Sequence, residues 1–149
     1  MSRSGYSDDW DGDEWQTIMA MGAVASAVRG KRGQRFFRDL VAALDAMPAR
    51  RLITDDLVRE DSTGFENVCA LGALGKARGV DLKPLDPENP HQVAAAFDIS
   101  PTLAREVVYE NDEGAWSRET PEQRWFRVRR WAASKIKVTA EADQISAGS

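Results

Sequence analysis

The sequence predicts an all-α protein, a compact bundle of about six short helices around a central helix of small residues at 67–78. Three observations support this fold class. Apolar residues recur every three or four positions along most of the chain, which is the spacing of an amphipathic helix. Prolines and glycines stand at the ends of these periodic segments, where helices begin and end. The run from Val68 to Gly75 is apolar or small on every side, so other helices must enclose it.

A basic loop joins the first two predicted helices. The first is expected at residues 13–29, and its second half consists of small residues that allow a neighbouring helix to approach closely before Gly30 ends it. The second helix has a broad apolar face from Phe37 to Met47. Pro48 ends this pattern, because proline removes a helical hydrogen bond and collides with the preceding turn.

The middle of the chain contains one ambiguous segment and one well-defined helix. Residues 51–58 are too few to distinguish a helical turn from an edge strand, and we expect a short helix there. Residues 59–66 combine acids with Ser, Thr and Gly, which predicts a mobile, solvated loop. The central helix follows at 67–78, and Gly79 supplies the left-handed residue that ends it.

Three further helices are expected to begin with proline in the first turn, where its missing N–H does no harm. These starts are Pro90, Pro101 and Pro121, and a capping box surrounds the last of them. Asn111 continues the apolar stripe of the second of these helices, so we expect its side chain to satisfy backbone groups of a loop or helix end. The last helix should end near Lys137.

Length and composition predict a single folded domain. The chain has 149 residues, of which 42% are hydrophobic and 30% are charged. We expect a flexible acidic arm at residues 1–12, a helical domain at 13–137 and a disordered tail at 138–149. The acidic start is unlike a secretory signal, and no apolar run is long enough to span a membrane. The predicted location is therefore the cytoplasm.

A formal net charge of −4 conceals segments of opposite sign. Five acids occupy residues 8–14, whereas segments 29–38 and 124–137 contain bases and no acid. Helical spacing within the last segment predicts an outward basic stripe opposite its apolar face. The candidate binding residues are accordingly cations from these two basic segments: Arg29, Lys31, Arg32, Arg35, Arg127, Arg130 and Lys137.

Three interpretations of these bases stay open. They pair with the protein's own acids, or they bind an anion or nucleic acid, or they contact a partner protein. The start of a helix carries partial positive charge, so bases at the opening of the second helix favour an external anion there, and Gly30 and Gly33 would let it approach backbone N–H groups. A sequence pI near 5.1 argues against a dedicated nucleic-acid-binding protein. We expect Trp125 in the core, and Trp131 at the edge of the apolar arc.

The sequence lacks a complete catalytic or metal-binding set. It has one cysteine, Cys69, and one histidine, His91, which is far from the ligand set of a structural zinc site. We therefore expect no metal and no cofactor. Cys69 is expected to be a buried structural residue; the alternative is a nucleophile that works with Asn111 or Asp112.

Five segments of the chain carry a family resemblance: AVRGKRGQRFFRDLVAALDAMP, LITDDLV, VCALGALGKARGVD, LAREVVYENDE and ETPEQRWFRVRRWAASKI. The more specific pieces are the Cys-Ala-Leu-Gly-Ala run, Asn111-Asp112 and the Thr-Pro-Glu helix start. Together they resemble a family of small proteins of unknown function encoded in phages and prophages of Gram-negative bacteria. No activity or catalytic residue comes with this resemblance. It implies a small protein that binds and redirects host or phage machinery.

The leading hypothesis is a non-enzymatic accessory protein in the cytoplasm of a bacterial host that binds a host or phage macromolecule, with a protein partner favoured. One alternative is a nucleic-acid-binding protein that uses segments 29–38 and 124–137. A second is a cysteine-dependent enzyme that uses Cys69. Self-association through the Gly/Ala face of the first helix is a further alternative, which would make the protein a homodimer.

Overall fold

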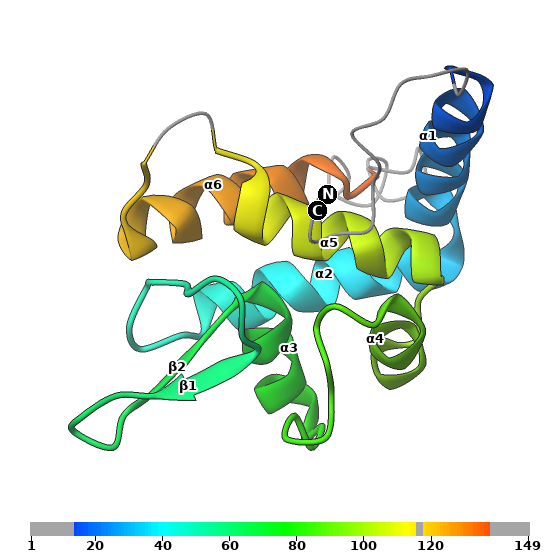
Figure 1. The fold of residues 1–149 in the computed structure, drawn as a ribbon. Helices are drawn as coiled ribbons and strands as arrows, with labels where there is room; N and C mark the ends of the chain where they lie inside the picture. Colours follow the sequence, from blue (N-terminus) through cyan, green and yellow to red (C-terminus); the bar gives the residue numbers. More distant parts are fainter. Residues whose placement is uncertain (1–13, 116–117, 138–149) are drawn as a thin grey trace, which may run out of the picture.

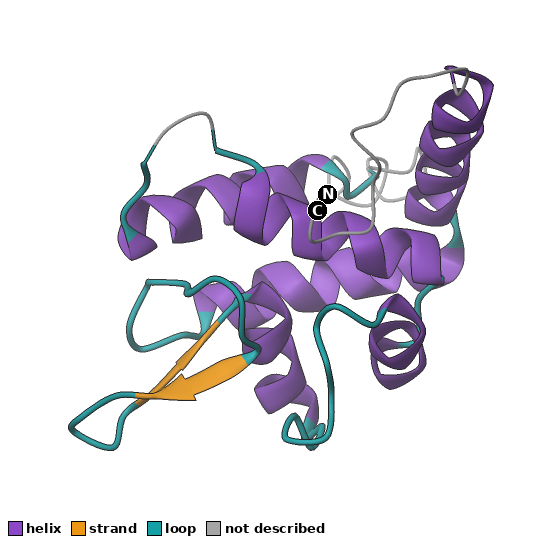
Figure 2. Cartoon of the chain, viewed as in Figure 1, coloured by secondary structure: helices purple, strands orange, loops and turns teal. Residues whose placement is uncertain are grey.

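The structure is a computed structural model that describes residues 14–115 and 118–137, and it confirms the mostly helical fold (Figures 1 and 2). The described part of the chain forms six helices and one two-stranded hairpin. In chain order these elements are α1 (Glu14–Arg29), α2 (Lys31–Asp45), β1 (Val58–Glu60), β2 (Glu66–Val68), α3 (Ala70–Arg78), α4 (Pro90–Phe97), α5 (Pro101–Glu113) and α6 (Pro121–Ser134).

Helix α2 is packed against α1, α3 and α6. Most of its apolar face is buried, including two phenylalanines whose rings meet edge to face at 5.2 Å. Burial of each such side chain stabilises the fold by about 1.5–3 kcal/mol. The opposite face of α2 is polar and exposed. The fully buried side chains of α2 are Phe36, Phe37, Leu40 and Leu44.

The predicted helix of small residues forms as α3, and every residue from Ala70 to Gly75 is buried. Its predicted start at residue 67 is wrong, because residues 66–68 form β2 and Cys69 is the N-cap. The small residues permit a close approach between α3 and the loop before the hairpin. A Cβ atom added at Gly72 would lie 1.9 Å from the carbonyl oxygen of Leu57, so only glycine fits there. Gly79 ends the helix in the left-handed conformation with φ 74°, as expected.

The prediction of a short helix at 51–58 is wrong. This segment is an extended loop that leads into β1, and Asp55 within it has a left-handed φ of 76°. Its backbone bonds to distant elements, since Leu52 N donates to the carbonyl of Pro121 and Ile53 N donates to that of Val68. These long-range hydrogen bonds replace the local ones that a helix would need.

The loop predicted at 59–66 is the turn of a hairpin, and its ends are strand residues. The two strands pair antiparallel, with Val58 opposite Val68. The Asp61 carboxylate organises the turn by accepting from the backbone N–H groups of Thr63 at 2.9 Å and Phe65 at 3.2 Å. Side chains that bond to nearby backbone in this way stabilise turns.

Side-chain caps begin the three helices that start with proline. The side chains of Asn89, Ser100 and Thr120 each accept a hydrogen bond from the first turn of α4, α5 and α6. The predicted capping box is present, because Thr120 N also donates to the side chain of Gln123 at 2.9 Å. Such caps stabilise a helix by about 1 kcal/mol each.

The acidic arm predicted at residues 1–12 and the tail predicted at 138–149 lie outside the described residues. Within the described ranges, no helix has both the length and the apolar character that crossing a membrane requires.

Candidate functional site

Gln34 joins three helix ends at one corner of the molecule. Its side chain is buried, with 6% of the residue exposed. Its amide nitrogen donates to the carbonyl of Val28 at 2.7 Å and to that of Lys135 at 2.9 Å. Its amide oxygen accepts from the backbone N–H of Lys137 at 2.7 Å. One glutamine at the start of α2 therefore satisfies backbone groups at the end of α1 and beyond the end of α6.

From this corner, α2 and α6 run side by side in opposite directions. Phe37 packs against Trp131 with ring centroids 5.4 Å apart. Farther along, the indole N–H of the fully buried Trp125 donates to the carbonyl of Leu44 at 3.1 Å. As expected, Trp125 is a core residue and Trp131 is only partly buried. The two basic segments, far apart in sequence, are thus neighbours in space.

Both of the paired helices carry exposed cations. On α2 these are Lys31, Arg35 and Arg38, which recur at the i, i+4 and i+7 positions of one helix face and are exposed. Arg130 and Lys137 are exposed on and just after α6. None of the five has an ion-pair partner among residues 14–115 and 118–137. We call these five residues the basic face.

A shallow hollow of about 680 Å³ adjoins the basic face where α2 ends and α6 begins. Phe126 lies at this hollow and is 62% exposed, and the Arg50 guanidinium stands 4.8 Å above the Trp125 ring. A two-bond ion pair between Arg129 and Asp45 crosses from α6 to α2. The hydrogen bond from Arg129 lowers the pKa of Asp45. At neutral pH this carboxylate is therefore ionised and paired with Arg129.

The remaining candidates from the first basic segment have other surroundings. Arg32 lies on a different side of α2 and pairs with Asp98 at 3.4 Å. The interpretation that these bases pair with the protein's own acids therefore holds for Arg32. Arg29 is exposed, and its backbone carbonyl accepts from the Lys137 ammonium at 3.0 Å. This contact holds Lys137 beside the end of α1 without neutralising its charge.

Arg127 does not belong to the outward stripe, and that prediction is wrong. Its guanidinium forms two hydrogen bonds with the Glu119 carboxylate, at 2.7 and 3.1 Å. It also donates to the backbone carbonyls of Glu110 at 2.7 Å and Asn111 at 3.3 Å, in the last turn of α5. Only 23% of its side chain is exposed. Arg127 therefore caps α5 and fixes the residues before α6, so its role is structural.

Cys69 is the N-cap of α3, and its sulfur accepts from the backbone N–H of Gly72 at 3.4 Å. Burial raises the pKa of the Cys69 thiol from 9.0 to about 12, although the Gly72 N–H favours the thiolate. The thiol is therefore protonated at neutral pH. Since it ionises at lower pH in the unfolded chain, its contribution to stability is complete below pH 9 and is lost as the pH rises toward 12.

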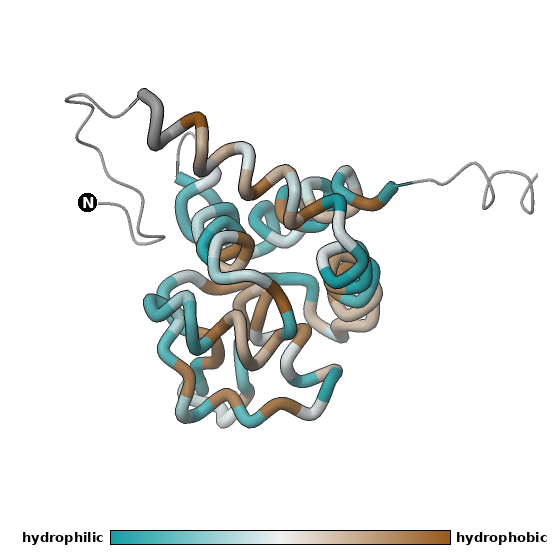
Figure 3. Tube along the Cα trace, turned by 90° about the vertical axis from the view of Figure 1, so that its right-hand side faces the viewer, coloured by the Kyte–Doolittle hydropathy of each residue, from teal (hydrophilic) through white to brown (hydrophobic). Residues whose placement is uncertain are grey.

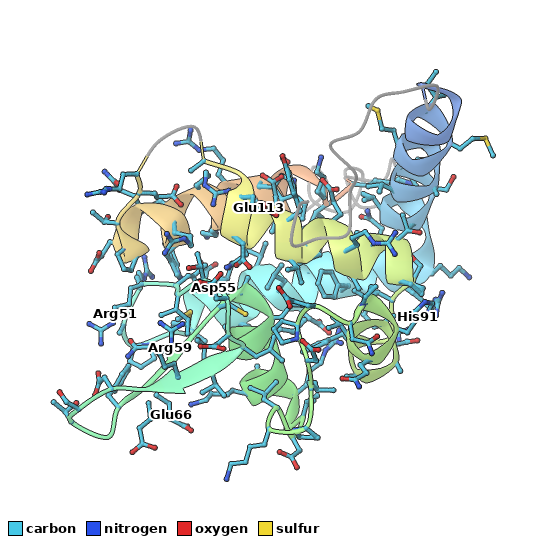
Figure 4. The ribbon with its side chains drawn as sticks, in the orientation of Figure 1. Arg51, Asp55, Arg59, Glu66, His91 and Glu113 are labelled. Atoms are coloured by element: carbon cyan, nitrogen blue, oxygen red, sulfur yellow. The ribbon has the colours of Figure 1, made fainter. Side chains whose placement is uncertain are left out.

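The cavity beside Cys69 is lined by no histidine among the described residues. This cavity holds only about 10 Å³ and is lined by Asp55 and Asp112 among others, and the charge of Asp112 also opposes thiolate formation. Figure 4 places His91 on α4, well away from Asp55 and the loop before the hairpin. The arrangement expected of a cysteine nucleophile is not found among the described residues.

Asn111 is the buried polar residue predicted to satisfy backbone groups, and the structure confirms this role. Its side-chain oxygen accepts from Ala70 N at 3.0 Å, at the start of α3. Its amide nitrogen donates to the carbonyl of Ile53 at 2.9 Å and to the Asp112 carboxylate at 2.8 Å. Through these hydrogen bonds, Asn111 holds α5, α3 and the extended loop together.

Sequence reasoning missed Gln34 and Glu119, the two residues that position the basic segments. A signal for Gln34 was present, because it lies three and seven residues before Phe37 and Val41 on the inner side of the helix. A polar residue in such a stripe needs buried partners. Glu119 had no comparable signal, since it precedes α6 in a loop.

The contrast between two arginines of α6 gives a stability prediction. Arg127→Ala should lower the free energy of unfolding by about 2–3 kcal/mol, because it removes both Arg127 hydrogen bonds from the Glu119 carboxylate, leaving it only Arg124, and both Arg127 hydrogen bonds from the carbonyls at the end of α5. Arg130→Ala, at an exposed position on the same helix, should change it by less than about 0.5 kcal/mol. Urea unfolding followed by circular dichroism measures both values. Equal effects of the two substitutions would contradict the structural role of Arg127.

The burial of Cys69 gives a chemical prediction. Iodoacetamide should label Cys69 in the folded protein far more slowly than in a short peptide at pH 8, because the thiol is both protonated and inaccessible. Raising the pH from 8 to 10 should accelerate labelling of the peptide and leave the folded protein almost unchanged. Mass spectrometry of the intact chain follows the reaction. Rapid labelling of the folded protein would show a reachable thiolate and revive the enzyme alternative.

Comparison with known proteins adds no relative: no protein-family model, curated protein or solved structure matches this chain. The resemblance to phage and prophage proteins stays a prediction. The functional interpretation consequently depends on the arrangement of the described residues.

Proposed function

We propose that the protein is a non-enzymatic binding protein that holds an acidic segment of a partner protein on its basic face. The observation that carries this proposal is the antiparallel pairing of α2 and α6, because exposed cations without carboxylate partners among the described residues lie on both of these neighbouring helices: Lys31, Arg35, Arg38, Arg130 and Lys137. Elsewhere, cations such as Arg78 and Arg129 have a carboxylate partner within the fold.

An acidic partner would relieve the repulsion among these cations. Complementary charge raises the rate of association and fixes the orientation of the partner more than it raises affinity. Affinity needs an anchor as well. The hollow beside the basic face supplies a surface for one, because Phe126 is exposed and lies next to Arg129 and Arg130. Aromatic and arginine side chains in such positions contribute a large part of the binding energy in protein interfaces.

A protein partner is favoured over nucleic acid by the charge of the whole molecule. With a formal net charge of −4, the chain repels a long polyanion beyond the reach of the basic face. Dedicated nucleic-acid-binding domains are strongly basic. A short acidic protein segment needs only the local surface, and the distant acids affect it little because salt screens charges over about 8–10 Å.

Two further features support a binding role in preference to catalysis. The Cys69 thiol is protonated and buried, and the described residues hold no group of three or more His, Cys, Asp or Glu side chains that could bind a metal ion. The resemblance to phage and prophage proteins supports a partner from the host or the phage, in the host cytoplasm.

The proposal predicts which charges matter. Arg35→Glu combined with Arg38→Glu should weaken capture of partner proteins from nuclease-treated bacterial lysate at least about tenfold, because it reverses the centre of the basic face. The control is Lys76→Glu combined with Lys83→Glu, at one position on α3 and one after it. It changes the net charge by the same amount as the first double variant and should leave capture unchanged. Quantitative mass spectrometry of the bound proteins, at low and high salt, gives the result.

Two outcomes would contradict the proposal. If capture depended on nucleic acid and disappeared with nuclease, the nucleic-acid alternative would be supported. If the two double variants captured partners equally well, the basic face would not be the contact surface.

A further inference from the structure

A groove of about 530 Å³ lies beside the hairpin, on a part of the surface that shares no residue with the basic face. Ligand sites typically have volumes of about 300–1,000 Å³, so the groove is large enough for several side chains. Part of its lining comes from β2 and the hairpin turn. The rest is mostly small or apolar and comes from α2, the loop after it and α3: Ala43, Ala46, Met47, Pro48, Ala73 and Ala77.

The groove follows the edge of β2 that faces away from β1. Five consecutive residues of the hairpin line it, from Gly64 to Val68. Successive residues of a strand point to opposite faces, so a groove that touches all five must follow an edge of the strand and not one face. No residue of β1 (Val58–Glu60) lines it, so this edge is the outer one.

The hydrogen bonds of the hairpin show which main-chain groups point to this outer edge. Cys69 N donates to the carbonyl of Leu57, and Asp61 N donates to that of Phe65. In an antiparallel pair, hydrogen-bonded positions alternate with positions whose N–H and C=O groups point away from the partner strand. Glu66 therefore directs both of its main-chain groups away from β1.

The chain already uses the outer edge at one end. Ile53 N donates to the carbonyl of Val68 at 3.0 Å, as a residue of an added strand would do. Among the described residues, no hydrogen bond reaches the N–H or the C=O of Glu66. The groove thus differs from the exposed apolar side chains of α1 (Figure 3), because it offers main-chain groups to a ligand.

The groove also contains an unpaired positive charge. The Arg51 Nε donates to the side chain of Asn67 at 2.9 Å, and the guanidinium stands 5.2 Å from the centre of the Phe65 ring. Within the part of the chain that the structure describes, Arg51 has no carboxylate partner. Glu66 points to the other side of the hairpin (Figure 4), where its carboxylate and the Lys76 ammonium pair at 2.6 Å.

We propose that an extended segment of a partner protein, in which apolar and acidic residues alternate, adds to β2 as a third strand in this groove. The main-chain groups of Glu66 require an extended chain, because a helix bonds its own N–H and C=O groups internally. Every second side chain of the segment would reach the apolar lining beside α3, and the acids between them would reach Arg51.

A second copy of this chain is a poorer occupant. Antiparallel pairing of two β2 edges about Glu66 would place two glutamates opposite each other, which is destabilising. The proposed strand site is also separate from the basic face. Proteins held by one of these surfaces should therefore tolerate substitutions in the other.

Amide exchange of the full chain, measured by NMR, tests strand addition. The probe is an acetylated and amidated heptapeptide in which leucine and aspartate alternate, beginning and ending with leucine. It should bind saturably below about 1 mM and slow exchange of the Glu66 amide at least about tenfold. The Cys69 amide, which already bonds to Leu57, should change little. Absence of binding, or binding that leaves the Glu66 amide unprotected, would overturn the inference.

Two methylated forms of the probe test the use of a strand edge. Alternate residues of a strand direct their N–H groups to the same edge, so N-methylation of two leucine amides and of two aspartate amides blocks opposite edges. One form should bind at least about tenfold more weakly than the parent probe, and the other should bind within about threefold of it. Weakening by both forms, or by neither, would overturn the strand geometry.

Two kinds of protein variant test the site and its charge. Ala77→Glu, at an exposed position in the groove, should weaken probe binding at least about threefold, whereas Ala95→Glu, at an exposed position of α4, should not. The wild-type protein should prefer the aspartate probe to its asparagine counterpart by about two- to fivefold, and Arg51→Gln should remove this preference. Circular dichroism checks that each variant is folded. Equal effects at Ala77 and Ala95, or a preference that survives Arg51→Gln, would overturn the inference.

Discussion

The arrangement of this protein depends on the buried amide of Gln34. A buried amide without partners costs about 1–3 kcal/mol, and the ends of helices leave backbone groups that need partners as well. Gln34 meets both needs, because its two amide atoms bond to Val28, Lys135 and Lys137 from two different helix ends. The corner between α1 and α2 and the end of α6 are thereby fixed to each other.

This contact also fixes where the charge lies. Two basic segments repel each other, yet here they are neighbours because the inner sides of α2 and α6 share a large apolar interface that includes Phe37 and Trp125. Hydrophobic burial and the Gln34 hydrogen bonds together offset the repulsion among cations that solvent already screens. The fold thus places two basic segments on neighbouring helices of a protein of negative net charge.

The helices could be predicted because they depend on neighbouring residues in the sequence. The predictions that failed concern residues whose structure depends on long-range contacts. The caps at Asn89, Ser100 and Thr120 depend only on neighbouring residues, so the sequence reveals them. The segment 51–58 is extended because its N–H groups bond to Pro121 and Val68, partners that no local pattern discloses. Arg127 is an exception for a similar reason. Helical spacing predicts an outward side chain, but hydrogen bonds to Glu119 and to the end of α5 hold it against the protein. The basic residues were visible in the sequence, but the packing of the two basic segments against each other was not, because it depends on Gln34 and on the apolar contacts between α2 and α6.

Backbone hydrogen exchange in a Gln34→Met variant tests the central claim, that this amide holds the ends of α2 and α6 together. Methionine keeps the size of the side chain and removes its hydrogen bonds. The account predicts that amides at residues 135–137 lose most of their protection while the amide of Val128, in the middle of α6, keeps it. Unchanged protection at 135–137 would show that the two basic segments stay together without Gln34, and would contradict the account.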